Sequence, residues 1–333
     1  MTDNTDKNNI IEIRDMVVEF KKPRGSLLAV NNVNFDIEKG KVTALVGESG
    51  SGKSTLAFTI MNIVNISGRI RSGTVKFKGL DVLTLPPAQL RSYKWNKVSM
   101  IFQSAQSALN PLMTIKEHFA ETYLTHVPKA NEKDMIARFS ALLDHVRLDA
   151  KRVLDLYPHE MSGGMKQRVM IAFSMLLEPE VIILDEPTTG MDVITQDYIF
   201  SILDDIHAET NISMLLLTHD IGVVAKVADI ISVMYAGKIV EKGEIYKVFA
   251  SPAHPYTDAL IKTSPSLLDT SSDKEPIKGS PPDLIMLPAG CAFHPRCPYA
   301  KEKCRHEVPE YRSIGPDRFV ACHYPIHDER KED

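Results

Sequence analysis

The sequence predicts an α/β fold with a mixed β core, an antiparallel β layer, an inserted helical segment and a cysteine-containing C-terminal extension. Short apolar runs rich in β-branched residues, such as residues 42–46 and 181–184, are typical of buried strands. Apolar residues recur at helical spacing from Thr114 to about Leu154, which indicates helices. All four cysteines fall within residues 291–322, which sets the C-terminal region apart.

The composition and charge of the chain narrow the classes of function. With 333 residues and 44% hydrophobic content, the chain is long enough for one large domain and a smaller one. A net charge of -4 gives no basic surface of the kind that a dedicated nucleic-acid binder carries. No segment reaches the roughly 18 apolar residues of a membrane span, and residues 1–9 lack the apolar core of a signal peptide. We therefore expect a soluble or peripheral protein.

Strands are predicted along most of the chain by apolar alternation or by short apolar runs. They comprise residues 11–20, 33–37, 42–46, 73–77, 98–102, 181–184, 213–217 and 238–241. The strand at 73–77 is expected to be antiparallel, and the last strand lies in a hairpin between Gly237 and Gly243. After residue 251 we expect an extended segment with a short helix, and then a linker rich in Ser, Pro and Asp at residues 270–288.

Residues 47–55, GESGSGKST, form the motif that organises the chain. They match the glycine-rich phosphate loop, and they lie between a predicted strand and a predicted helix, as that motif requires. Lys53 is expected to reach the β- and γ-phosphates, and the Ser54 hydroxyl is expected to hold Mg²⁺. The expected nucleotide contacts of the loop are Ser49, Gly50, Ser51, Gly52, Lys53, Ser54 and Thr55.

Two carboxylates follow the apolar strand at residues 181–184. Asp185 is suited to be a water-mediated Mg²⁺ ligand, and Glu186 is suited to polarise an attacking water. A strand-end turn capped by Asp185 is the alternative, but the phosphate loop favours catalysis. His219 follows the next predicted strand and is placed to reach a γ-phosphate and that water.

Two further sites are weaker when taken alone. Ser162 is a good helix N-cap, and Gly163 and Gly164 permit the close approach of a phosphate or a backbone. Phe20 precedes a charged loop at residues 21–26 and is either an adenine platform or a core residue at a strand end. The local sequence leaves both interpretations of Phe20 open.

Together these residues resemble the ATP-binding-cassette ATPases. The shared features, in order, are the phosphate loop, Gln103, Ser162-Gly163-Gly164, Asp185-Glu186, the loop at residues 189–192 and His219. Residues 103–111, 254–257 and 290–298 further resemble the oligopeptide and dipeptide importer ATPases, and the resemblance spans about Ile10 to Tyr324.

The resemblance implies an ABC-type P-loop NTPase with a mixed β core, an antiparallel β subdomain, an inserted α-helical subdomain and a C-terminal metal-binding extension. The implied domains are an ATPase domain at residues 10–251, with a helical subdomain at about 104–161, and an oligopeptide-transporter-type extension at residues 252–333.

The resemblance also implies a mechanism and a set of partners. Two cassettes would pair head to tail around two ATP molecules, so that Ser162 and the glycines after it serve the partner's nucleotide. Gln103 would contact Mg²⁺ or its water, and Phe20 would be the adenine platform. The implied partners are a second homologous ATPase, in a heterodimer, two permease subunits and an extracytoplasmic substrate-binding protein, without nucleic acid. The implied location is peripheral, at the cytoplasmic face of the inner membrane.

The cysteine spacings x5, x6 and x17 match neither a zinc ribbon nor the ferredoxin run. Four thiolates suit either Zn²⁺ or an iron–sulfur cluster. The resemblance implies a [4Fe-4S] cluster, and a zinc ion or unmetallated thiols are the alternatives. The expected ligands are Cys291, Cys297, Cys304 and Cys322.

The expected function is an ATP-hydrolysing subunit that powers the import of di- or oligopeptides. One alternative is the ATPase of a nickel or other small-solute importer. Another is a soluble cassette ATPase acting on protein or nucleic-acid complexes, which usually carries two fused cassettes or long coiled insertions. A nucleotide-binding regulator would be expected to lack the equivalents of Glu186 or His219, and both are present.

Overall fold

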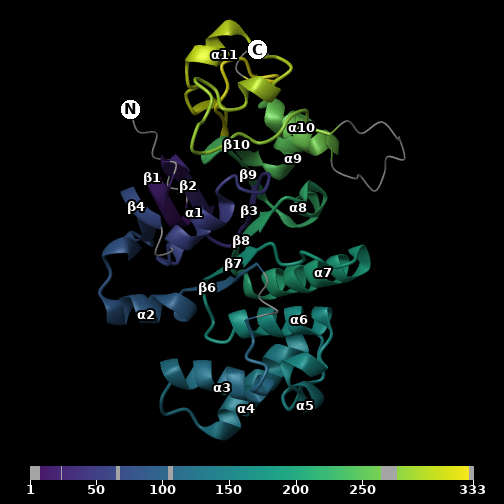
Figure 1. Cartoon of the computed structure of the whole chain (residues 1–333). Helices are drawn as coiled ribbons and strands as arrows, with labels where there is room; N and C mark the ends of the chain where they lie inside the picture. The colour runs from purple at the N-terminus through teal and green to yellow at the C-terminus, as the bar shows by residue number, and fades with distance from the viewer. Residues whose placement is uncertain (1–7, 24, 65–67, 104–107, 264–275, 330–333) are drawn as a thin grey trace. The chain divides into compact units, whose positions relative to one another are not determined.

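The structure is a computed structural model that describes residues 8–23, 25–64, 68–103, 108–263 and 276–329. It divides into two compact units (Figure 1). Unit 1 comprises Met1–Thr84 and Leu216–Asp333, and unit 2 comprises Leu85–Leu215. Residues 104–107 of the expected helical subdomain, and residues 270–275 of the expected linker, lie outside the described residues. Unit 1 includes residues on both sides of the boundary expected at residue 251, and that boundary stays a prediction.

Unit 1 contains the predicted antiparallel layer as a sheet of four strands in the order β2-β1-β4-β5. These strands are β1 (Asn9–Lys22), β2 (Gly25–Glu38), β4 (Gly68–Phe77) and β5 (Leu80–Asp81). The pairings of β1 with β2 and with β4 are antiparallel, which confirms the prediction for residues 73–77. Ile11 and Ile13 alternate with polar neighbours and are fully buried, so the alternation read from the sequence marks the core face.

A second set of strands in unit 1 mixes parallel and antiparallel pairs. The buried strand β3 (Val42–Val46) pairs in parallel with β9 (Ile230–Tyr235), and β9 forms an antiparallel hairpin with β10 (Lys238–Glu244). The predicted hairpin is therefore confirmed, but it is not the last one. The extension adds β11 (Arg312–Gly315) and β12 (Arg318–Val320), and β12 pairs with β10. These two strands were not predicted from the sequence, because they are short and begin with arginines.

The helices of unit 1 are α1 (Lys53–Ile60), α8 (Ile221–Val227), α9 (Ile245–Ala250), α10 (Pro255–Thr263) and α11 (Glu302–His306). The short helix expected after residue 251 is α10. A small buried cluster of Ala253, Ile314 and Val320, with Cys322 packed against it, joins the start of the C-terminal extension to β11 and β12. The extension therefore has a buried cluster of its own, and the pairing of β12 with β10 attaches it to the hairpin.

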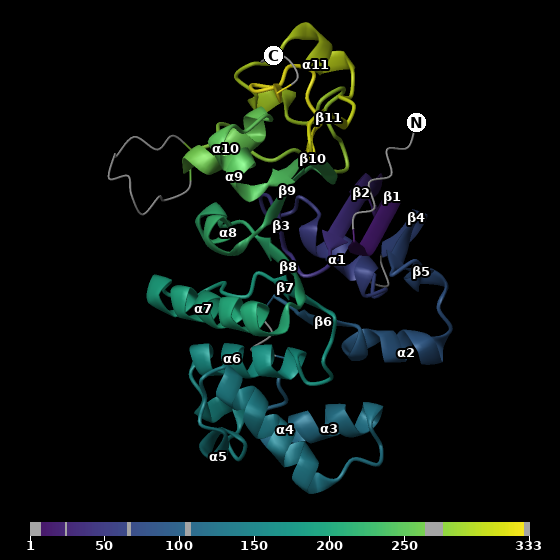
Figure 2. The same cartoon turned by 180° about the vertical axis from the view of Figure 1, so that it is seen from behind.

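Unit 2 is mostly helical, as the spacing of its apolar residues predicted. Its elements are α2 (Pro87–Asn96), β6 (Val98–Ile101), α3 (Ile115–His126), α4 (Glu132–His145), α5 (Ala150–Val153), α6 (Gly163–Ser174), β7 (Val181–Asp185) and α7 (Val193–Thr210). Strands β6 and β7 pair in parallel, and helices α3 to α6 group together (Figures 1 and 2). Their packing centres on Phe119, whose ring lies 5.1 Å from Phe139 and 5.2 Å from Phe173. Strand β8 (Ser213–Thr218) crosses the boundary of the two units.

None of the helices in the described ranges is long and apolar enough to cross a membrane.

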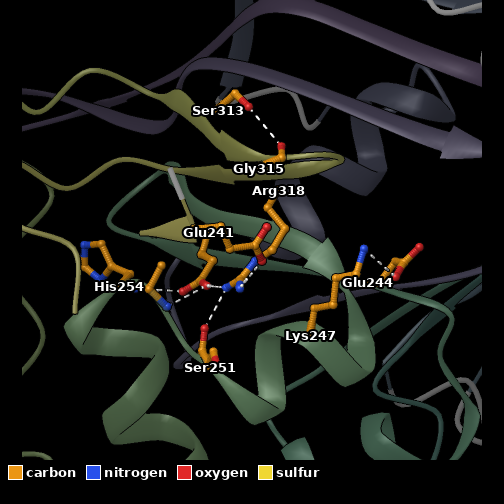
Figure 3. A network of polar contacts seen from close by, with 10 residues as sticks. Glu241, Glu244, Lys247, Ser251, His254, Ser313, Gly315 and Arg318 are labelled. Carbon is orange, nitrogen blue, oxygen red and sulfur yellow. Dashed lines mark hydrogen bonds and ion pairs between the residues drawn. The ribbon is translucent and has the colours of Figure 1, made fainter. Parts of the chain in front are cut away.

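A buried ion pair joins β12 to β10 (Figure 3). The side chains of Arg318 and Glu241 are 1% and 0% exposed, and Nη2 of Arg318 lies 3.0 Å from Oε1 of Glu241. The same nitrogen donates to the carbonyl of Ser251 at 2.7 Å. Glu241 also accepts the backbone N–H groups of Ala253 and His254, each at 2.8 Å. Because a buried charge pair needs such additional hydrogen bonds to offset its desolvation, this network fixes where the extension leaves the sheet.

His254 gives unit 1 a predicted sensitivity to acid. Its ring is buried, and Nδ1 accepts the backbone N–H of Tyr256 at 3.0 Å. Burial lowers the pKa of His254 from 6.5 to about 3. Because the folded pKa is the lower one, the stability that the neutral ring contributes is complete above the unfolded pKa and is lost as the pH falls toward the folded pKa. Between those values we expect the free energy of unfolding to fall by about 1.4 kcal/mol per pH unit.

Urea denaturation at a series of pH values measures this slope, and His254→Asn is the matched control. Asparagine is a good helix N-cap residue whose side-chain oxygen can accept the Tyr256 amide, but it does not titrate. As the pH falls through this range, the free energy of unfolding of the variant should therefore fall by about 1.4 kcal/mol per pH unit less than that of the wild type. Equal slopes for the two proteins would show that another group governs unfolding in acid.

Candidate functional site

The phosphate-loop sequence forms a tight turn between β3 and α1, and two positions in it accept only glycine. A Cβ atom at Gly47 would lie 2.2 Å from the carbonyl oxygen of Met234. At Gly52, where φ is 111°, a Cβ atom would lie 2.2 Å from the carbonyl oxygen of Ala29. Any side chain at these positions would push the loop away from the strands that support it. The first and sixth positions of the motif are therefore fixed by packing within unit 1.

Lys53 points its ammonium group back into the loop. Its side chain is buried, and Nζ donates to the carbonyls of Gly47 at 2.7 Å and Glu48 at 3.1 Å. The hydroxyl of Ser51 is also buried, and it has no hydrogen-bond partner among the described residues. A buried cation and an unsatisfied hydroxyl inside a ring of backbone groups match the chemistry of a phosphate ligand.

The remaining loop residues predicted to contact nucleotide lie around this cradle. Ser49 and Gly50 are exposed at the tip of the loop, and Ser54 and Thr55 are half-buried in the first turn of α1. Because helix N-termini attract anions, the first turn of α1 adds to the attraction of this loop for phosphate. All the residues of the loop that are predicted to contact nucleotide lie in unit 1.

Phe20 lies near the end of β1, opposite Leu27 of β2 and Gly68 of β4. Its ring is half-buried and covers Gly68, where an added Cβ atom would lie 2.7 Å from the ring. The ring is thus a partly exposed apolar surface at a strand end. Both interpretations made from the sequence, an adenine platform and a strand-end residue, agree with this position.

Unit 2 brings Gln103 and Glu186 together. Nε2 of Gln103 donates to Oε2 of Glu186 at 3.0 Å, and the hydroxyl of Thr189 donates to the same oxygen at 2.8 Å. Asp185, the last residue of β7, is buried, and Glu186 follows it with a φ of 47°. This left-handed conformation is uncommon outside glycine and turns the chain sharply at the end of the strand. Thr189 had no predicted role, although a hydroxyl three residues after a carboxylate at a turn is a recognisable partner.

The Ser162-Gly163-Gly164 segment begins helix α6. Ser162 is the N-cap, and its hydroxyl accepts the backbone N–H of Met165 at 3.3 Å. Ser162 and Gly163 are exposed, whereas Gly164 is half-buried. The structure therefore confirms the helix start that was predicted and leaves an exposed helix N-terminus in unit 2.

His219 follows β8 and is exposed. The next residue, Asp220, caps α8 by accepting the backbone N–H groups of Gly222 at 2.9 Å and Val223 at 3.3 Å. Strand β8 thus ends at the histidine because the helix begins directly after it. A polar side chain at the carboxyl end of a buried strand is the position expected for a ligand-contacting residue in an α/β fold.

The four cysteines are thiols in unit 1. Burial raises the pKa of the Cys322 thiol to about 12, and the thiols of Cys291, Cys297 and Cys304 lie near enough to raise it further. A backbone hydrogen bond of 2.8 Å from Cys291 to the carbonyl of Cys304 joins two of the segments that carry them. Cysteine sulfur is the type of donor that a zinc ion or an iron–sulfur cluster takes.

In the part of the chain that the structure describes, no group of three or more His, Cys, Asp or Glu side chains is arranged to hold a metal ion. The metal-binding character of the extension therefore stays a prediction.

The loop, the strand-end carboxylates and the mixed sheet define the class of phosphate-loop nucleotide-binding proteins. A model of the ABC transporter family matches residues 30–189, and a model of the oligopeptide/dipeptide transporter C-terminal region matches residues 240–304. The chain is 41% identical over 314 residues to the dipeptide transport ATP-binding protein DppD of Caldanaerobacter subterraneus subsp. tengcongensis, covering 94% of this chain and 96% of that protein. It is 40% identical over 324 residues to the oligopeptide transport ATP-binding protein OppD of Salmonella typhimurium, covering 96% and 95%.

The fold is also that of solved cassettes. The dimeric structure of MJ0796, a bacterial ABC transporter cassette, matches with a TM-score of 0.62 and 27% identity, covering 71% of this chain and 98% of that chain. The chain therefore belongs to the ABC transporter ATP-binding proteins, among the dipeptide and oligopeptide transport ATP-binding subunits.

Proposed function

We propose that this chain hydrolyses ATP to power the import of di- or oligopeptides through a membrane transporter. The observation that carries the proposal is the phosphate loop, with Lys53 buried inside it and an unsatisfied Ser51 hydroxyl beside it. The two relatives described above are named as dipeptide and oligopeptide transport ATP-binding proteins. The C-terminal match to the oligopeptide/dipeptide transporter region supports peptide as the cargo class.

The residues of the proposed ATPase site have separate tasks. Lys53 would bind the β- and γ-phosphates, Ser54 would hold Mg²⁺, and Phe20 would support the adenine ring. Glu186 would orient the attacking water, and Asp185 would contact the metal through water. Mg²⁺, when bound, neutralises charge on the phosphate oxygens.

The hydrogen bonds around Glu186 support its role. Gln103 and Thr189 both donate to Oε2, so two hydrogen bonds hold the carboxylate in one orientation, in which it would accept a proton from water. Gln103 would also contact the metal or its water in this proposal. His219 stabilises the γ-phosphate and the same water.

The proposed mechanism needs a second cassette. Ser162, Gly163 and Gly164 would bind the nucleotide held by the partner's loop, and their place at an exposed helix start supports this. The proposed assembly is a heterodimer with a homologous ATPase, two permease subunits and an extracytoplasmic substrate-binding protein. The chain would then be peripheral, at the cytoplasmic face of the inner membrane.

Affinity purification of the tagged chain from detergent-solubilised membranes tests this assembly. We expect to recover two permease subunits and a second cassette ATPase, with ATP turnover that rises when peptide and its binding protein are added to the reconstituted complex. Recovery of ribosomes or nucleic acid without permease would overturn the proposal. If nickel or another small solute stimulated ATP turnover and peptide did not, the transported cargo would be that solute and not a peptide.

We also propose that Cys291, Cys297, Cys304 and Cys322 hold a [4Fe-4S] cluster, with a zinc ion as the alternative. The support is the donor set, four neighbouring thiols in one small segment of unit 1. A bound cluster would replace four thiol protons and tie together segments with few apolar residues. Anaerobically purified protein should be brown and carry iron and sulfide. A colourless protein with one zinc per chain would support the alternative.

A further inference from the structure

Glu48, in the phosphate loop, is held by two residues of the C-terminal extension. Arg296 donates through Nη1 to Oε2 of Glu48 at 2.7 Å and through Nη2 to Oε1 at 2.9 Å. The hydroxyl of Tyr256 accepts the backbone N–H of Glu48 at 2.9 Å. The side chain and the main chain of one loop residue are thus fixed by residues that lie 248 and 208 positions further along the chain.

Both anchoring side chains are themselves held firmly. The side chain of Arg296 is 5% exposed, and it also donates to the carbonyl of Lys278 at 3.0 Å and to the hydroxyl of Tyr235 at 3.3 Å. Tyr256 is fully buried, with its ring 4.6 Å from that of Tyr235 and 5.3 Å from that of Phe293. An arginine whose three guanidinium nitrogens all donate hydrogen bonds, and a tyrosine packed between aromatic rings, are poorly placed to follow a moving loop.

Glu48 in turn orients the groups that face the phosphates. Its carbonyl accepts from Nζ of Lys53 at 3.1 Å and from the backbone N–H of Ser51 at 3.2 Å. A shift of Glu48 would therefore move the acceptor that orients the lysine and one of the amides of the loop. Anion binding by such a loop depends on these groups converging on one point.

We propose that Arg296 and Tyr256 are positioning residues that hold the phosphate loop in its ATP-binding shape, so that the C-terminal extension sets the affinity for ATP. The proposal rests on the proposed function, in which this loop binds ATP. A loop that is ordered beforehand loses less conformational freedom when its ligand binds. The two parallel charge-assisted hydrogen bonds from Arg296 to Glu48 specify geometry as well as energy. We call these bonds, together with the hydrogen bond between Tyr256 and Glu48, the tether.

A double-mutant cycle on the full-length chain tests the tether. We expect Arg296→Gln and Glu48→Gln each to raise the Kd for ATP about tenfold, equivalent to about 1.4 kcal/mol, in a titration with a fluorescent ATP analogue and Mg²⁺. The double variant should be no worse than about tenfold, because the second substitution removes a contact that is already lost. Tyr256→Phe, which removes only the hydroxyl, should raise the Kd about fivefold.

Arg305→Gln is the matched control. Arg305 lies in the same extension and pairs at 3.9 Å with Glu302, where both side chains are more than half exposed. This variant should bind ATP as the wild type does. Thermal unfolding of every variant is measured in parallel, because a merely structural role would lower the unfolding midpoint without coupling Arg296 to Glu48 in the Kd for ATP.

The possible results separate this inference from the proposed function. A Kd within twofold of wild type for both Glu48→Gln and Arg296→Gln would overturn the tether, as would losses that multiply to about a hundredfold in the double variant. If Arg296→Gln does not fold, Glu48→Gln and Tyr256→Phe decide the question in the same titration. If the wild-type chain does not bind ATP at all, the proposed function fails first.

Discussion

Glu186→Gln should stop ATP hydrolysis while leaving ATP binding intact. The amide has the shape of the carboxylate and can still accept from Gln103 and Thr189, as Glu186 does at 3.0 and 2.8 Å. It cannot accept a proton from the attacking water, so we expect turnover to fall by about 10²- to 10⁴-fold. The Kd for ATP should change by less than about threefold, because this contact is made mainly in the transition state.

The measurement is phosphate release by the assembled complex with the partner site disabled, together with a binding titration. Size-exclusion chromatography with ATP should show the two cassettes retained as a closed dimer. Glu178→Gln, the same chemical change at a side chain that is 79% exposed, should leave turnover unchanged. Wild-type turnover by the Glu186 variant would remove this residue from the catalytic site.

Lys53→Ala should have the opposite signature, because it removes the cation that we propose binds the phosphates. Charge-assisted hydrogen bonds are worth about 1.5–3 kcal/mol each, so we expect the Kd for ATP to rise by at least about 10- to 100-fold. The substitution also leaves the carbonyls of Gly47 and Glu48 without the donor that they have at 2.7 and 3.1 Å. A lower unfolding midpoint in the absence of nucleotide is therefore expected as well.

The two effects are separated by measuring binding and unfolding on the same preparation. Lys247→Ala is the control within unit 1, since this side chain is 45% exposed and pairs only with Glu244 at 3.1 Å among the contacts described. That variant should bind ATP normally. If Lys53→Ala also bound ATP with wild-type affinity, the loop would not be the phosphate site.

Some features could be predicted from the sequence because their signal is local. The spacing of residues 47–55 identifies a phosphate loop, because the residues that define this motif all lie within nine consecutive positions. The start of α6 at Ser162 is equally local, because a cap acts over a single turn. Strands β3 and β7 are fully buried, so their apolar runs were also sufficient.

Other features could not be found in the sequence because their partners are distant or their pattern is weak. Strands β11 and β12 have 4 and 3 residues, too few to show a period. From the sequence alone, Arg318 would be expected at the surface. Its side chain is nevertheless 1% exposed, because its charge is paired with that of Glu241, 77 positions away. The clustering of the cysteines near the C-terminus was visible, but that their thiols interact depends on the folded extension.

By itself, the sequence predicted a loop for phosphates and carboxylates for metal and water, and its resemblance to a family implied that the helix start at Ser162 serves a second nucleotide. The loop and the carboxylates were predicted from residue types at short spacings, where chain connectivity fixes the geometry. Only the tertiary structure decided that Glu48 is hydrogen-bonded to Arg296, 248 positions away, and to Tyr256. Such contacts depend on distance and burial in the folded chain, which no local pattern encodes, and here they join the C-terminal extension to the phosphate loop.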